Sequence, residues 1–209
     1  MKNSKIATEK RIAELRAEEK ALLQYPMYAD ILGRKCLKKY GVCSQCTLFA
    51  IMETLGLQSD DVLKAATGFL GGIGCLGVNS CGAFTAGVMA LSYEFGRERY
   101  NWYKDLGLLK TLVKRLYNRF TDEYGSNVCR DIQKKVLGRS YDLWDPRDIE
   151  LFENVSPQLY ECGIVVGSAA RWTVELILEG ENEVKKIKRT ERFRRKGWEF
   201  IQFLKDLLF

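Results

Sequence analysis

The stretch GFLGGIGCLGVNSCGAFTAGVMAL, residues 68–91, decides how this chain is expected to fold. Its first half carries five glycines between residues 68 and 77, a density that is costly inside a regular helix, so it predicts a tight, irregular passage. In the second half, Ala83, Gly87 and Ala90 recur every three to four positions and predict a helix with one smooth face. A neighbouring helix can approach such a face closely, which favours a helical bundle.

Helical signals flank this stretch on both sides. A helix is expected over residues 43–55, because Gly56 can take the left-handed conformation that closes a helix. Ser59 is expected to cap a short helix that starts at Asp60. Further helices are predicted at residues 4–24, 102–123, 128–137, 157–178 and 182–208. Gly180 is taken to separate the last two of them.

No segment shows a convincing strand pattern. GIVVG, residues 163–167, continues into small residues that are typical of a close-packed helix. The predicted fold class is therefore all-α, a compact helical bundle with N-terminal and C-terminal helical extensions. We expect an N-terminal helical extension over residues 1–39, a cysteine-rich domain over residues 40–178 and a basic and apolar C-terminal helix over residues 179–209.

The composition excludes several kinds of chemistry. The chain has 209 residues, of which 46% are hydrophobic, 29% are charged and only 3 are proline, as in a well-packed globular protein. It has no histidine, which excludes Ser-His and Cys-His catalysis, mixed Cys/His zinc sites and haem attachment through Cys-x-x-Cys-His. The seven cysteines are therefore the main candidates for chemistry.

The positive charge is concentrated near the end of the chain. Residues 185–196 hold eight Lys or Arg and one Glu, which accounts for the excess behind the net charge of +6. The apolar residues after this run favour docking on the same subunit or on a second one, as in a homodimer. An anionic membrane surface or an acidic redox partner protein is the alternative, and no recognised motif favours nucleic acid. Because residues 1–23 are charged and lack an apolar segment, we expect a cytoplasmic, reducing location.

The cysteines lie in segments rich in small residues. Cys43 and Cys46 are three residues apart, which places both sulfurs on one face of the expected helix, where they can bind metal or cycle as a dithiol. Cys36 has lysines nearby on both sides and is expected to be a surface thiol with a lowered pKa. The remaining cysteines, which can converge with the first pair in a bundle, are Cys75, Cys81, Cys129 and Cys162.

Four motifs occur in a recognisable order: CSQCTLFAIMETLGL (43–57), the quoted stretch (68–91), Cys129-Arg130 and Glu161-Cys162. With them, residues 40–178 resemble the redox-active family named for its C-GCAxxG-C-C pattern, which is similar to the non-haem part of split-Soret cytochromes. The resemblance implies an all-helical redox domain whose four family cysteines are Cys43, Cys81, Cys129 and Cys162. One departure is Ala86, which stands at the last glycine of the motif, with Gly87 one place later.

The resemblance further implies that these four cysteines bind an iron–sulfur cluster for electron transfer, with [2Fe–2S] favoured over [4Fe–4S]. Cys46 and Cys75 are extra cysteines near the expected site and are second-rank candidate ligands. Backbone N–H groups of residues 71–77 and the side chain of Arg130 are expected to offset the negative charge of the cluster. Close helix packing alone is the alternative reason for the glycines.

Two other functions stay open. A thiol-disulfide oxidoreductase would use Cys43 and Cys46 as its dithiol, with Cys81 or Cys75 as the partner thiol. A binding module would act through the basic C-terminal helix, and its cysteines would be only structural. Electron transfer, the leading hypothesis, requires a redox partner protein.

Overall fold

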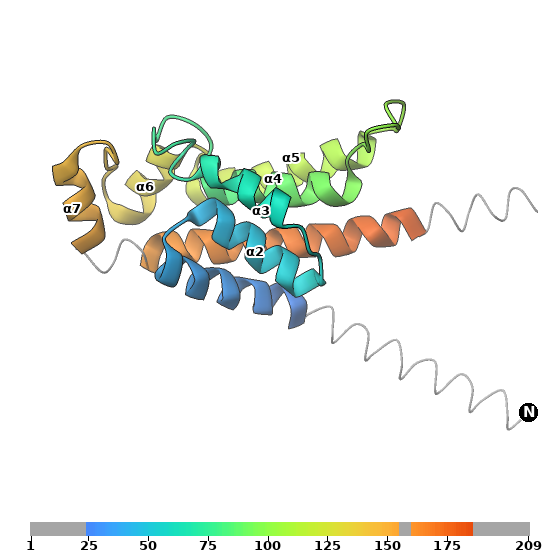
Figure 1. Cartoon of the computed structure of the whole chain (residues 1–209), viewed down its shortest axis with the longest axis horizontal. Helices are drawn as coiled ribbons and strands as arrows, with labels where there is room; N and C mark the ends of the chain where they lie inside the picture. Colours follow the sequence, from blue (N-terminus) through green and yellow to red (C-terminus); the bar gives the residue numbers. More distant parts are fainter. Residues whose placement is uncertain (1–23, 155–159, 186–209) are drawn as a thin grey trace, which may run out of the picture.

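Helices make up all the regular structure of the residues that the computed structural model describes, which are 24–154 and 160–185 (Figure 1). Residues 24–40 and residues 160–185 are helical. Between them lie α2 (Cys43–Leu55), α3 (Asp60–Ala65), the 3₁₀ helix η1 (Ala66–Phe69), α4 (Gly82–Phe95), α5 (Gly107–Tyr124), α6 (Cys129–Leu137) and α7 (Pro146–Asn154). The predicted all-α class is confirmed. Most of the predicted helices at residues 4–24 and 182–208 lies outside the described residues.

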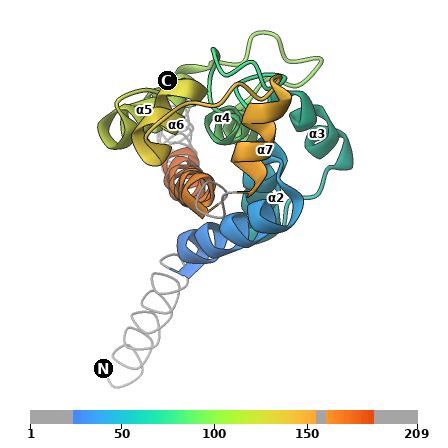
Figure 2. The same ribbon diagram turned by 90° about the vertical axis from the view of Figure 1, so that its left-hand side faces the viewer.

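Helix α4 lies at the centre of the bundle, among α2, α3, α5 and α6 in the end view (Figure 2). Its small residues Ala83, Gly87 and Ala90 are buried, as their spacing predicts. A Cβ atom added to Gly87 would lie 2.6 Å from Oγ1 of Thr173 and 2.7 Å from Cδ2 of Leu116. The smooth face therefore brings α4 against both α5 and the 160–185 helix.

The 160–185 helix runs along the bundle without a break (Figure 1). The prediction that Gly180 separates two helices is wrong, because Gly180 is helical and buried. A Cβ atom at this position would lie 2.7 Å from Cζ of Phe95 and 2.9 Å from Cδ1 of Leu112. This glycine permits close packing and does not end the helix.

Several predicted boundaries are confirmed by local geometry. Gly56 ends α2 with a φ of 67°, and the side chain of Ser59 accepts a hydrogen bond from the N–H of Val62 at the start of α3. Helix α5 begins at residue 107, five residues later than predicted. Helix α7 was not predicted: Pro146 stands at its first position, where a missing N–H costs nothing.

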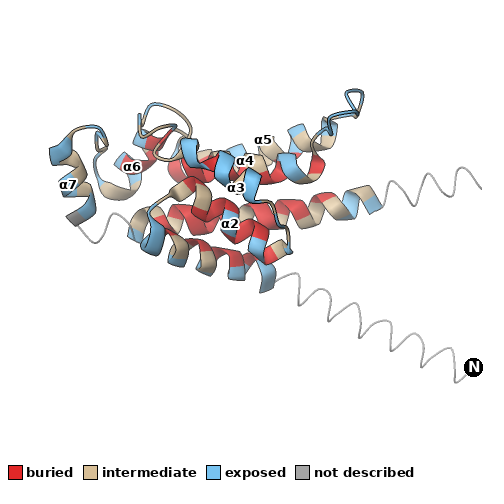
Figure 3. Ribbon diagram, in the orientation of Figure 1, coloured by how far each residue is buried: buried red, intermediate tan, exposed pale blue. Residues whose placement is uncertain are grey.

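Buried residues gather on the facing sides of α2, α4, α5 and the 160–185 helix (Figure 3). The ring of Phe120 lies at the centre of an aromatic group and contacts the rings of Phe84, Tyr124 and Trp172. The 24–40 helix also contributes Ala29 and Leu37 to this core. None of the helices in the described ranges is long and apolar enough to cross a membrane.

Candidate functional site

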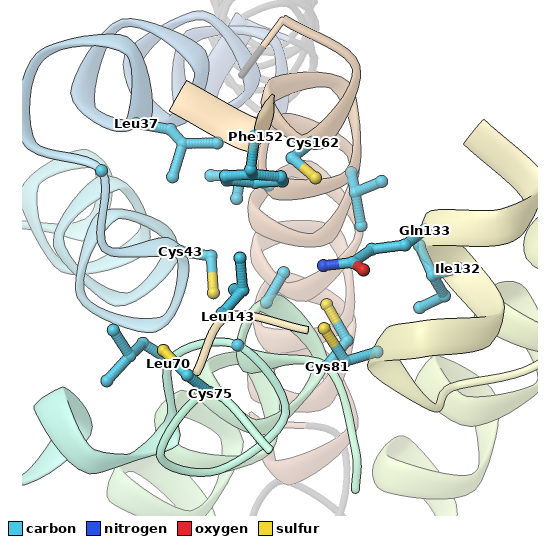
Figure 4. A pocket seen from close by; sticks show the side chains of 16 residues that line it. Leu37, Cys43, Leu70, Cys75, Cys81, Ile132, Gln133, Leu143, Phe152 and Cys162 are labelled. Atoms are coloured by element: carbon cyan, nitrogen blue, oxygen red, sulfur yellow. The ribbon is translucent and has the colours of Figure 1, made fainter. Parts of the chain in front are cut away.

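A cavity of about 80 Å³ is lined by five of the seven cysteines (Figure 4). They come from separate segments and are the four candidate ligands, Cys43, Cys81, Cys129 and Cys162, together with Cys75. Apolar side chains, among them Leu37, Leu70, Leu143 and Phe152, line much of the remainder. Because a single water needs only about 10–15 Å³, the cavity has room for a group of several atoms. The structure thus brings the four candidate ligands to one place.

Three of these cysteines stand at the beginning of a helix. Cys43 and Cys129 are the first residues of α2 and α6, and Cys81 is the N-cap of α4. The first turn of a helix presents unpaired N–H groups and a partial positive charge. Three helix N-termini therefore meet at the cavity, an arrangement that stabilises negative charge on sulfur.

Backbone N–H groups near two of the sulfurs lower the thiol pKa values against the effect of burial. The N–H groups of Gly71 and Ser44 act in this way on Cys43, and those of Ala83 and Phe84 act on Cys81. The expectation that the glycine-rich turn supplies such donors is met at Gly71. Donors of this kind tune the charge and potential of thiolate-bound groups.

Glycines let the cysteine-bearing segments approach one another. A Cβ atom on Gly82 would lie 2.5 Å from Sγ of Cys43, and one on Gly72 would lie 2.7 Å from Cβ of Cys129. Gly82 also faces the backbone oxygen of Phe69, 2.8 Å from an added Cβ. The glycine of the Cys-Gly-Ala motif thus makes room for the first family cysteine.

The glycine-rich turn has an uncommon backbone. Residues 71–75 all have positive φ, including the two non-glycine residues Ile73 (66°) and Cys75 (63°). This left-handed conformation costs roughly 1–2 kcal/mol for a residue with a Cβ. The turn is held by hydrogen bonds from the N–H of Gly74 to the oxygen of Gly68 and from the N–H of Cys75 to the oxygen of Leu70. It carries Cys75, a second-rank candidate ligand, into the cavity wall.

Gln133 adds to the cavity wall a polar group that no sequence motif indicated. The side chain is only 4% exposed, and its Oε1 accepts a hydrogen bond of 2.9 Å from the N–H of Tyr141. This bond fixes the amide orientation, so that the Nε2 donor points toward the cavity (Figure 4). An N–H donor is therefore available to an anionic group inside.

Burial makes the cavity thiols hard to ionise. It raises the pKa of Cys81 to about 12 and also raises the pKa values of Cys43, Cys75, Cys129 and Cys162. Neutral thiols are poor nucleophiles at physiological pH, whereas a bound cation stabilises the thiolate form. The cavity is thus better suited to metal binding than to thiol exchange.

Two cysteines lie elsewhere. Cys46 does not line the cavity, although it is only three residues from Cys43; its Sγ lies 2.7 Å from Sγ of Cys36. Cys36, expected to be a surface thiol, is half-buried against this partner. The Arg130 side chain is exposed and does not line the cavity, so it does not supply the expected positive charge in the wall.

The cysteine sulfurs lie at separate places in the cavity wall and do not converge on one position. Among the described residues, no three His, Cys, Asp or Glu side chains lie close enough together to hold one metal ion. A cluster places iron and sulfide between its thiolates, so its ligands need not converge on a single ion. The cysteine thiols, the nearby N–H groups and the space left by Gly72 and Gly82 fit an iron–sulfur cluster.

Comparisons with known proteins agree with the position of the cavity. A family model described as "Putative redox-active protein (C_GCAxxG_C_C)" matches residues 42–176, which is more than half of the chain. The matched range contains all five cavity cysteines and leaves Cys36 outside. No curated protein and no solved structure matches the chain.

Proposed function

Because the chain belongs to the C_GCAxxG_C_C family of redox-active proteins, we propose that it binds an iron–sulfur cluster and transfers single electrons. The observation that carries the proposal is the meeting of Cys43, Cys81, Cys129 and Cys162 around one cavity. Family membership supports a redox role, and the donor set supports the kind of cofactor. When bound, the cluster would supply one-electron chemistry at potentials set by its surroundings.

The chain's own residues would hold the cluster and control its charge. The four family cysteines would bind iron as thiolates, and the N-termini of α2, α4 and α6 would offset their negative charge. The apolar wall would restrict water, and Gln133 would donate a hydrogen bond. A low local dielectric strengthens each of these interactions.

We favour [2Fe–2S] over [4Fe–4S], on the resemblance to split-Soret cytochromes. Cys75 is the second-rank ligand that the cavity supports, since it contributes a fifth sulfur to the wall. Cys46 is not supported as a ligand, because it does not line the cavity and lies against Cys36 instead.

The test is anaerobic purification of the full chain, followed by iron and acid-labile sulfide analysis and paramagnetic resonance. We expect equal amounts of iron and sulfide and a resonance signal on one-electron reduction. Protein that is colourless and holds neither element, even after reconstitution, would remove the proposal. A four-iron stoichiometry would remove only the preferred cluster type.

A protein partner would exchange electrons at the face formed by the glycine-rich turn. Ile73, Leu76 and Val78 are exposed there, and Nε1 of the exposed Trp144 donates to the oxygen of Gly74 in the same turn. Apolar side chains close to a redox centre suit a docking surface. Substituting Leu76 with Glu should slow reduction by a reductase without changing reduction by dithionite; equal rates with the reductase would argue against docking here.

We also propose that the protein is a homodimer and that it is cytoplasmic. Analytical ultracentrifugation should show a dimer, and a monomer at micromolar concentration would contradict this proposal. A cytoplasmic location agrees with seven free cysteines, since a reducing compartment keeps thiols unpaired. Apart from Lys185, the basic C-terminal residues, on which the membrane-surface and binding-module alternatives depend, lie outside the described part of the chain.

A further inference from the structure

A second cysteine pair lies outside the cavity and joins two neighbouring helices. Cys36 belongs to the 24–40 helix and Cys46 to α2, and their Sγ atoms are 2.7 Å apart. A disulfide needs about 2.05 Å, so only a small movement separates the pair from a bond. Within the described residues, no third His, Cys, Asp or Glu completes a metal site with them. The pair is therefore better placed for redox chemistry than for holding an ion.

The pair opens onto a surface groove of its own. This groove, of about 500 Å³, is lined by Cys36, Tyr40, Val42, Gln45, Cys46, Phe49 and Leu63. None of the cavity cysteines contributes to it. A small molecule can thus reach Cys36 without entering the cavity, and chemistry here is independent of any cluster.

The two thiols are not equivalent. Cys36 is half-buried, whereas Cys46 is only 1% exposed. The hydrogen bond that they share lowers the pKa of Cys36, and the same bond together with burial raises the pKa of Cys46. Cys36 therefore ionises first and is also the accessible sulfur, as an attacking thiol must be.

One lysine stands at the edge of the groove. The Nζ of Lys39 lies 4.9 Å from the ring centroid of Tyr40, which lines the groove. An ammonium group in this position attracts carboxylates. A small disulfide that carries negative charge would therefore match the positive charge of Lys39.

We propose that Cys36 and Cys46 form a reversible dithiol–disulfide pair that reduces a small, carboxylate-bearing disulfide bound in this groove. The Cys36 thiolate attacks one sulfur of the substrate, so a mixed disulfide forms and the first substrate thiol leaves. The Cys46 thiol gives its proton to solvent and attacks Cys36 Sγ, which releases the second thiol. In sum, the protein loses two electrons and two protons, and the substrate disulfide becomes two thiols.

Redox titration tests the pair directly. The anaerobically purified full chain is equilibrated with different ratios of reduced and oxidised glutathione, free thiols are blocked, and linked peptides are sequenced by mass spectrometry. We expect a Cys36–Cys46 link that forms and reverses with the ratio. A pair that stays fully reduced at every ratio, or a link from Cys36 to Cys43, would overturn the proposal.

Single variants separate the attacking thiol from the resolving one. Cys46→Ser should accumulate glutathione on Cys36, because nothing resolves the mixed disulfide, and Cys36→Ser should leave Cys46 unmodified. Absence of glutathione on Cys36 in Cys46→Ser contradicts the assignment. Circular dichroism shows that each variant is folded. Cys36→Ser should also keep the iron and sulfide content of the wild type, so failure of the cluster proposal and failure of this one are distinguishable.

The charge of the substrate has its own test. Lys39→Glu should slow oxidation by oxidised glutathione several-fold and leave oxidation by the neutral 2-hydroxyethyl disulfide unchanged. Equal slowing with both disulfides, or slowing with neither, would show that Lys39 does not select the substrate.

Discussion

Gly82 stands so close to Cys43 that a Cβ atom at position 82 would lie 2.5 Å from the Sγ of Cys43. The two residues are the first helical residues of α4 and α2. The same added atom would lie 2.8 Å from the backbone oxygen of Phe69 and 3.2 Å from the N–H nitrogen of Ser44. The contact therefore fixes both the approach of the helices and the position of one sulfur in the cavity.

Gly82→Ala should destabilise the protein by about 1–3 kcal/mol and lower its iron content, because backbone atoms cannot move aside cheaply. Thermal unfolding and iron analysis measure the two effects. Gly68→Ala is the matched control, since nothing lies within 4 Å of its added Cβ and its φ is not positive. Equal stability of the two variants would contradict the packing argument.

Replacing the cysteines one at a time should distinguish the cluster ligands from the cysteines that do not bind the cluster. Cys129→Ser and Cys162→Ser should lose most of the bound iron and sulfide, because each removes a thiolate from the cavity wall. Cys46→Ser should keep wild-type amounts, because Cys46 lies outside the wall. Iron loss in Cys46→Ser, or retention in both of the others, would count against the assigned ligand set.

Gln133→Leu should make the reduction potential more negative, because it removes an N–H donor that stabilises the added electron. We expect a shift of roughly 40 mV, the one-electron equivalent of about 1 kcal/mol. Spectroelectrochemistry measures it, with iron content as the check that the cluster is retained. An unchanged potential at full iron content would mean that the amide does not reach the cluster.

Cys75→Gly should raise the free energy of unfolding of the metal-free protein by about 1 kcal/mol, because glycine adopts a φ of 63° without the cost that a Cβ imposes. Denaturant unfolding measures the gain, and Cys75→Ser is the control that keeps the strain. We expect both variants to retain the cluster on the four family cysteines. Loss of iron from both would instead make Cys75 a ligand.

Alkylation of Cys36 by iodoacetamide should begin at lower pH than that of the cavity cysteines. The hydrogen bond with Cys46 lowers the pKa of Cys36, so its thiolate is present at pH values where the buried thiols are still protonated. In Cys46→Ala this bond is lost, so the pKa of Cys36 should rise and the reaction profile should move to higher pH. A profile that stays in place would show that the pair does not share a proton as described.

The local signals in the sequence predicted much of the bundle. Gly56 and Ser59 end one helix and begin the next as expected, because their roles depend on backbone conformation and neighbouring N–H groups. Helix α7 was not predicted, because a proline in the first turn of a helix, where Pro146 lies, looks the same in the sequence as a proline in a loop. The sequence could not show that Gly180 lies inside a helix, because a glycine that makes space for Phe95 looks the same in the sequence as one that closes a helix.

The order of the cysteines and the small-residue face of α4 were determined by the sequence alone, since both are properties of residue type and spacing. The tertiary structure decided which sulfurs meet. Cys43 and Cys46 share one helix, yet Cys43 joins the cavity and Cys46 contacts Cys36, because different helices pack against the two positions. Cys75 lies on a left-handed turn and Gln133 accepts a hydrogen bond from the N–H of Tyr141; both features are local, but only the packing of the helices brings the two residues into one cavity wall.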